Sequence, residues 1–89
     1  MNHDAEWDEE KNRRNRQEKG VAFEDCLDIF NDPDAVIGEQ ERQGEIRFKL
    51  TGKAPEDLLT VVFTWRGKTR RIISAWPASR QERRAYLGR

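Results

Sequence analysis

The hydrophobic pattern is clearest at residues 45–50, where the sequence EIRFKL alternates charged and apolar positions without a break. This alternation predicts a β-strand with one buried face and one solvated face, because successive strand side chains point to opposite sides. The buried face is entirely apolar. The solvated face presents Glu45, Arg47 and Lys49.

The most apolar segment, LLTVVFTWR at residues 58–66, predicts a more deeply buried strand. Gly67 and Lys68 follow as a two-residue turn with glycine first, which is typical of a type II′ hairpin, and residues 69–75 predict the returning strand. Such a turn fixes the register of the two strands. It places Arg66 opposite Thr69, Trp65 opposite Arg70 and Thr64 opposite Arg71, so that Thr64, Arg66 and Arg71 share one face.

Two helices are predicted before these strands. The first covers residues 8–19, because Asp8 can cap its start, acidic residues occupy its first turn and Gly20 follows its basic end. It has almost no apolar face, and Trp7 is its main anchor. The second covers residues 22–31 and carries an apolar stripe that indicates packing against the core, made of Phe23, Cys26, Leu27, Ile29 and Phe30.

The other segments carry weaker patterns. Residues 1–6 have none, and we expect them to be flexible. Residues 35–37 suggest a short strand, and residues 38–44 suggest a polar connector. Near the end of the chain, Ser79 and Glu82 have the spacing of a capping box, which predicts a short helix that ends near Leu87.

These elements predict one domain over residues 1–89. Its expected class is α+β, with two N-terminal helices, a four-stranded antiparallel sheet and one short C-terminal helix. We expect the helices to pack on one face of the sheet and to leave the other face open to solvent.

The composition changes this picture in two ways. Hydrophobic residues make up 35% and charged residues 38% of the 89 positions, so the core must be thin. The net charge of zero hides an asymmetry, because residues 1–45 carry 6 basic and 14 acidic side chains and residues 46–89 carry 11 and 3. A basic half suggests a site for a polyanion. The alternative is that the two halves neutralise each other in the fold.

Several classes of site lack their usual residues. The single cysteine, Cys26, excludes an intrachain disulfide, and one histidine, His3, cannot build a zinc site. The sequence shows no Cys–His or Ser–His pair for nucleophilic catalysis. It also shows no glycine loop of the phosphate-binding type. The sequence contains no secretory segment and no membrane span, so we expect a cytoplasmic protein.

Arginine and lysine on the open face are the remaining candidates for chemistry. Guanidinium groups bind phosphate in a bidentate fork and stay charged at physiological pH, which suits a transition state with growing charge on phosphate oxygens. Arg66 and Arg71 are the leading candidates, with Arg47 on the neighbouring strand. Glu45 can orient Arg47 or act as a base. The alternative is that these side chains serve only solubility.

Six segments, taken in order and spacing, carry a resemblance to a known family. They are WDEEKNRRN at 7–15, GVAFEDCLDIFNDP at 20–33, GEIRF at 44–48, LLTVVFTWRG at 58–67, RRIISA at 70–75 and ASRQERRAY at 78–86. Together they resemble the BrnT-type toxins of bacterial type II toxin–antitoxin modules.

The resemblance implies a RelE-like ribonuclease fold and an endoribonuclease that inhibits translation by cleaving RNA, mRNA included. Cleavage would need no metal or other cofactor and would proceed by attack of the RNA 2′-hydroxyl on the adjacent phosphate. The resemblance also implies a BrnA-like antitoxin with a ribbon-helix-helix domain, which would neutralise the toxin. Operator DNA would be contacted only through that antitoxin, and no membrane would be involved.

Glu45, Arg47, Thr64, Arg66 and Arg71 match the family pattern, and the other candidates come from the residues themselves. The expected catalytic residues are Glu45, Arg47, Arg66, Arg71 and Lys19. The expected RNA contacts are Lys49, Thr64, Arg70 and Trp76, and Trp7 is expected to contact the partner.

Two of these positions depart from the family pattern. Lys19 stands where members usually carry histidine, and Trp76 stands where members usually carry arginine. The loss of one imidazole and one cation leaves an alternative open, namely a catalytically weakened module that binds RNA or the antitoxin.

Overall fold

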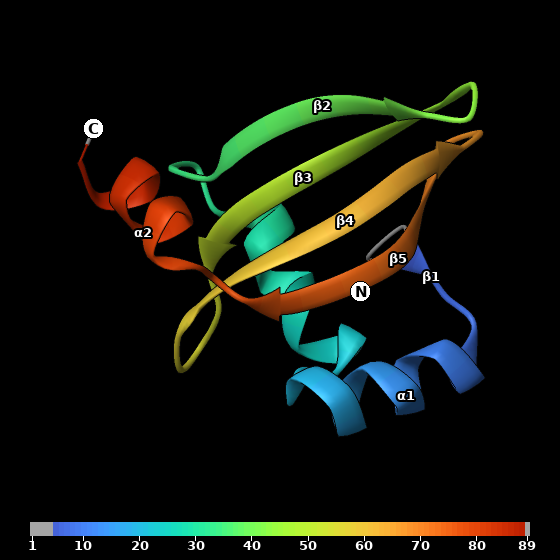
Figure 1. The fold of residues 1–89 in the computed structure, drawn as a ribbon, viewed down its shortest axis with the longest axis horizontal. Helices are drawn as coiled ribbons and strands as arrows, with labels where there is room; N and C mark the ends of the chain where they lie inside the picture. Colours follow the sequence, from blue (N-terminus) through green and yellow to red (C-terminus); the bar gives the residue numbers. More distant parts are fainter. Residues whose placement is uncertain (1–4, 89) are drawn as a thin grey trace.

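The structure is a computed structural model that describes residues 5–88, folded as an α+β domain (Figure 1). Its elements in chain order are β1 (Ala5–Glu6), α1 (Glu9–Lys19), the 3₁₀ helix η1 (Phe23–Asn31), β2 (Val36–Arg42), β3 (Glu45–Lys53), β4 (Leu58–Arg66), β5 (Thr69–Pro77) and α2 (Arg80–Leu87). Within the described residues, no helix is both long enough and apolar enough to cross a membrane.

The sheet has five strands in the order β1-β5-β4-β3-β2, and it is mixed. The prediction of four antiparallel strands was therefore wrong, because β1 adds a parallel strand beside β5, with Ala5 paired to Arg70 and Glu6 to Arg71. The expected flexible segment 1–6 is corrected at these two positions, and residues 1–4 lie outside the described part of the chain. Two residues are too few to show an alternation of their own, so this strand is defined only by its neighbour.

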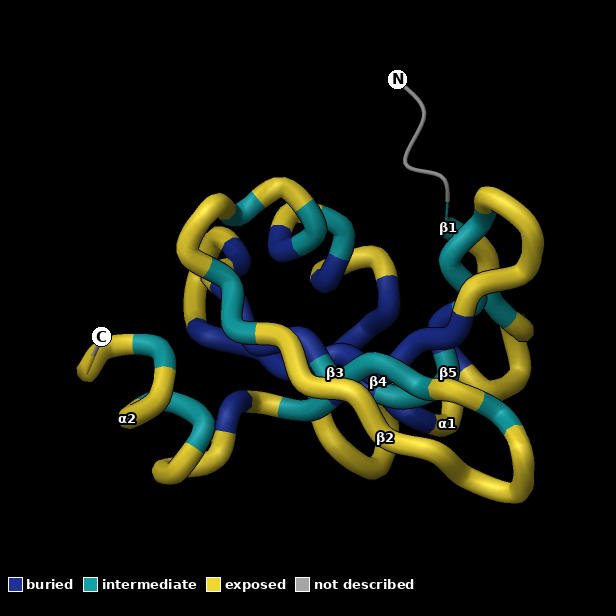
Figure 2. Tube along the Cα trace, turned by 90° about the horizontal axis from the view of Figure 1, so that it is seen from above, coloured by how far each residue is buried: buried dark blue, intermediate teal, exposed yellow. Residues whose placement is uncertain are grey.

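Strand β2 is longer than the sequence suggested. It runs from Val36 to Arg42 and includes most of the segment predicted as a polar connector. As an edge strand it is exposed along nearly its whole length (Figure 2), so no hydrophobic alternation marks it. A tight turn at Gln43 and Gly44, both with positive φ, joins it to β3.

The β4–β5 hairpin has the predicted register, with Arg66 opposite Thr69 and Thr64 opposite Arg71. Gly67 has a φ of 61°, as glycine at the first central position of a type II′ turn requires. The pairing shifts register between Val62 and Phe63, because β5 carries one extra residue there, Ile73.

Helix α1 is capped as predicted, with Asp8 accepting hydrogen bonds at its start and Gly20 in the left-handed conformation at its end. Its only buried residues are two asparagines, Asn12 and Asn15. The Asn15 amide donates to the carbonyl of Ala75 at 2.9 Å and its oxygen accepts from the Ala75 N–H at 3.3 Å. Asn15 thus provides hydrogen-bond partners for backbone groups at the edge of β5 that β1 does not reach. These bonds explain how a helix without an apolar face is held in place.

The core lies between the sheet and η1. It contains Phe23 and Ile29 from η1 and Leu50, Val61, Phe63 and Ile72 from the sheet. The buried residues of η1 are Phe23, Cys26 and Ile29, and this spacing of three matches a 3₁₀ helix. Cys26 is a buried core residue as expected, and burial raises the pKa of its thiol to about 12.

Helix α2 has the predicted bounds and capping box, but it does not join the other helices on their face of the sheet. Its Glu82 bonds to Lys49 and Thr60, which point away from the core. The expectation of helices on one face was therefore wrong. The capping box of α2 shows where the helix begins, but it does not show against which side of the sheet the helix packs.

Candidate functional site

The open face of the sheet carries a polar row that crosses all five strands. The row consists of Gln40, Arg47, Thr64, Arg71 and Glu6, one from each strand. Arg66 lies two residues beyond Thr64 on the same face. We call Arg47, Arg66 and Arg71 the arginine face, and side chains in adjacent positions of such a sheet have Cβ atoms about 5 Å apart.

Two of these three arginines have carboxylate partners. The Nε of Arg47 lies 3.0 Å from Oε1 of Glu45, and Nη1 of Arg71 lies 3.3 Å from Oε2 of Glu6. Arg66 is exposed and forms no ion pair with any described residue. The arginine face thus presents one guanidinium without a carboxylate partner among residues 5–88, beside two that are oriented by carboxylates, and each of the paired guanidinium groups keeps further N–H groups to donate.

Thr64 lies at the centre of the arginine face, but it is 5% exposed. Its hydroxyl donates a hydrogen bond of 2.8 Å to the carbonyl of Ile46. This bond extends the contact between β3 and β4 past the last paired residues, next to Arg47. The geometry makes Thr64 a residue that holds the strands beneath the arginines.

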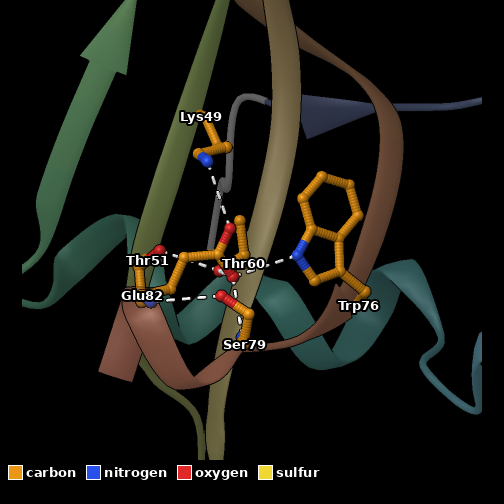
Figure 3. A network of polar contacts seen from close by, with 6 residues as sticks. All are labelled: Lys49, Thr51, Thr60, Trp76, Ser79 and Glu82. Atoms are coloured by element: carbon orange, nitrogen blue, oxygen red, sulfur yellow. Dashed lines mark hydrogen bonds and ion pairs between the residues drawn. The ribbon is translucent and has the colours of Figure 1, made fainter. Parts of the chain in front are cut away.

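A second polar cluster surrounds Glu82 at the other end of the open face (Figure 3). Oε1 of Glu82 accepts from the Ser79 N–H at 2.8 Å, the Thr60 hydroxyl at 3.0 Å and the Trp76 indole at 3.1 Å. Oε2 lies 3.1 Å from Nζ of Lys49. One carboxylate thus fastens α2 to β3, β4 and β5 at once.

The environment of Glu82 strongly favours its charged form. Burial by itself raises the pKa of this carboxyl group, but the hydrogen bonds from the Ser79 N–H, Lys49, Trp76 and Thr60 outweigh it and lower the pKa to about 2. Lys49, expected to contact RNA, is consequently paired inside this cluster.

Lys19 and Trp76 lie together. The Lys19 ammonium sits 5.3 Å from the centre of the Trp76 ring, at the end of α1. Trp76 is five residues along β5 from Arg71, which corresponds to about 16 Å along a strand. The structure therefore separates Lys19 from the arginine face and joins it to the cluster around Glu82.

Arg70 points to the opposite side of the sheet from the arginine face. Its guanidinium lies 4.5 Å from the ring centre of Phe30, 4.9 Å from that of Trp65 and 5.9 Å from that of Phe63. This stacking uses the flat guanidinium as part of the packing at the hairpin end.

Trp7, expected to contact the partner, is half-buried. Its ring packs edge-on against Phe23 with centroids 6.1 Å apart, and its indole donates to Glu9 at 3.1 Å. It anchors the start of α1 as the sequence suggested, and only part of its surface is open to a partner.

Two site residues were missed at the level of sequence. Glu6 lies in a two-residue strand without any pattern, and no sequence signal could have placed it beside Arg71. Glu82 was identified only as the end of a capping box, and its burial against the sheet depends on where α2 docks.

A model of one protein family matches residues 7–82, and the family is described as the ribonuclease toxin BrnT of type II toxin–antitoxin systems. The matched segment contains the arginine face and the Glu82 cluster. No curated protein matches the chain.

Proposed function

We propose that the arginine face is the centre of a metal-independent endoribonuclease, because this chain belongs to the BrnT family of ribonuclease toxins of type II toxin–antitoxin systems. The observation that carries the proposal is the row of Arg47, Thr64 and Arg71 with Arg66 beside it. Three guanidinium groups on a rigid sheet suit a phosphate whose oxygens gain negative charge during reaction.

The proposed step is transfer of the phosphate within the RNA chain. The 2′-oxygen forms a bond to the adjacent phosphorus, and the bond from phosphorus to the 5′-oxygen breaks. The 2′-hydroxyl proton passes to the Glu45 carboxylate, which Arg47 orients at 3.0 Å, and the departing 5′-oxygen takes a proton from solvent. Arg66 and Arg71 stabilise the charge on the non-bridging oxygens.

The cellular part of the proposal follows from the family. Cleavage of mRNA in the cytoplasm inhibits translation, and a BrnA-like antitoxin with a ribbon-helix-helix domain neutralises the toxin and brings it to operator DNA. The half-buried Trp7 supplies part of the antitoxin contact. A pull-down of the co-encoded antitoxin, with wild type and Trp7→Ala compared, tests this part, and unchanged retention would count against it.

The test of the catalytic centre is cleavage of a labelled RNA by purified protein in EDTA. Arg66→Ala and Arg71→Ala should each lower the cleavage rate by about 100-fold, the size expected when one donor to a transition-state oxygen is removed. Lys68→Ala is the matched control, since Lys68 is an exposed cation in the adjacent turn. Intact RNA with the wild-type protein over pH 5–9 would contradict the proposal.

A weakened binding module is the second candidate. It is favoured by the pairing of Lys19 with Trp76, the two positions that depart from the family pattern. Under this reading Lys19→His combined with Trp76→Arg raises the cleavage rate at least tenfold above wild type. A rate equal to that of wild type would refute it.

A further inference from the structure

A groove between α1 and β5 continues the candidate site along the edge of the sheet. It has a volume of about 190 Å³ and is lined by Lys11, Arg14, Asn15, Glu18, Lys19 and Ser74, among others. The groove begins where β1 ends. β1 pairs with β5 only at Arg70 and Arg71, and farther along this edge α1 contacts β5 through Asn15 and Ala75.

Both ends of this α1–β5 groove meet parts of the site already described. At one end the Lys11 N–H donates to Asp8 at 3.1 Å, and Glu6, two residues before Asp8, pairs with Arg71 at 3.3 Å. At the other end Lys19 stacks on Trp76, whose indole is bonded to Glu82. The groove therefore connects Arg71 with the Glu82 cluster.

The lining of the groove carries more positive than negative charge. Lys11, Arg14 and Lys19 are exposed, and none of them forms an ion pair with a carboxylate among residues 5–88. On the other side of the same helix, Arg13 is paired with Glu10. Among the described residues that line the groove, Glu18 is the only acidic one.

The architecture of α1 explains why these cations stay in one line. The helix is held by hydrogen bonds of Asn12 and Asn15 rather than by an apolar face. All its other positions are exposed, and the positions three, four and seven residues apart form one side. From Lys11 to Lys19 the helix rises about 12 Å, which spans about three phosphates at about 3.4 Å per stacked nucleotide.

We propose that the α1–β5 groove binds the sugar–phosphate backbone of single-stranded RNA next to the phosphate held on the arginine face, with Lys11 and Arg14 as phosphate contacts. The proposal deepens the proposed function, on which it rests for the identity of the polyanion. It makes the substrate an extended strand that leaves Arg71 along α1. An RNA too short to reach the groove lacks these contacts.

The test measures binding separately from cleavage. Fluorescein-labelled 2′-O-methyl oligoribonucleotides of 3 and 12 nucleotides lack the attacking hydroxyl, and their affinity is measured by fluorescence anisotropy from 50 to 200 mM salt. The double variant Lys11→Ala/Arg14→Ala removes two phosphate contacts, so the slope of log affinity against log salt should fall by about 1.4 for the 12-mer. Wild type should then lose about sevenfold more affinity than the variant over this salt range.

Arg13→Ala is the matched control, because it removes one cation from the same helix outside the groove. It should leave the slope near that of wild type, and the 3-mer should bind the double variant and wild type alike. Circular dichroism establishes that each variant is folded. Lys11→Arg/Arg14→Lys should show the same slope of log affinity against log salt as wild type, because both charges are kept.

An unchanged slope in the double variant, or an equal drop in Arg13→Ala, would overturn the inference even if the protein cleaves RNA. Poly-glutamate that displaces the 12-mer at matched charge would assign the groove to an acidic polypeptide and would also overturn it. Conversely, a slope that falls as expected supports the groove even if wild type fails to cleave RNA, in which case only the catalytic proposal is lost.

Discussion

Replacement of Glu82 by glutamine should remove a large pH-dependent part of the stability of this fold. The carboxylate is 13% exposed and fastens α2 to three strands. Glutamine keeps the size and one acceptor oxygen, but it turns an amide toward the Lys49 ammonium and has no charge. The variant therefore tests the charge of this carboxylate rather than its packing.

The magnitude follows from the pKa. The pKa of Glu82 falls from an ordinary value of 4.5 to about 2 in the folded protein, mainly because four hydrogen-bond donors overcome the cost of burial. At about 1.4 kcal/mol per pKa unit this corresponds to about 3 kcal/mol. Because the folded pKa is the lower one, this stability is fully present above about pH 4.5 and is lost as the pH falls toward 2.

The assay is urea unfolding followed by tryptophan fluorescence at pH 7, 5, 4, 3 and 2. Wild type should exceed Glu82→Gln in unfolding free energy by about 3 kcal/mol at pH 7, and the difference should shrink as the pH falls toward 2. Other acidic groups titrate in both proteins and cancel from the difference. The exposed Glu39→Gln on β2 should match wild type throughout.

Two results would refute this reasoning. A difference between wild type and Glu82→Gln that stays constant from pH 7 to 2 would show that the charge of Glu82 contributes nothing. An equal effect of Glu39→Gln would show that any removed carboxylate acts in the same way.

Asn15→Ala should lower the unfolding free energy by about 2–4 kcal/mol, because it leaves the backbone of Ala75 at the sheet edge without its partners; a melting temperature within 2 °C of wild type would argue against this role. Cys26 should resist alkylation by iodoacetamide at pH 8 in the native protein and react in 6 M guanidinium, since burial raises its pKa to about 12; rapid native labelling would contradict the buried core. Tyr86→Phe should cost about 1 kcal/mol in urea unfolding, because its hydroxyl donates to Asp32 at 2.7 Å and ties α2 to the end of η1. An unchanged midpoint would exclude that tie.

Local signals in the sequence predicted much of the fold. The Gly67-Lys68 turn fixes the β4–β5 register, because a two-residue turn leaves one way to pair the strands. The caps of α1 and α2 lie within their own segments, so their ends are visible in the sequence. The register in turn predicts that Arg66 and Arg71 share a face, and this part of the candidate site needed no tertiary structure.

The remaining features depend on what each segment meets in space. Strand β1 and most of β2 have no alternating pattern, and only the free backbone groups of their neighbours make them strands.

The sequence by itself thus determined the hairpin, the helix ends and the positions of the arginines, because turns, caps and alternation are encoded within a few neighbouring residues. The tertiary structure alone decided that Glu6 reaches Arg71, that Lys19 stacks on Trp76 away from the arginine face, and that Glu82 is buried beside Lys49. These contacts join residues 33 to 65 positions apart, and their geometry arises only when α1, β1 and α2 dock on the sheet.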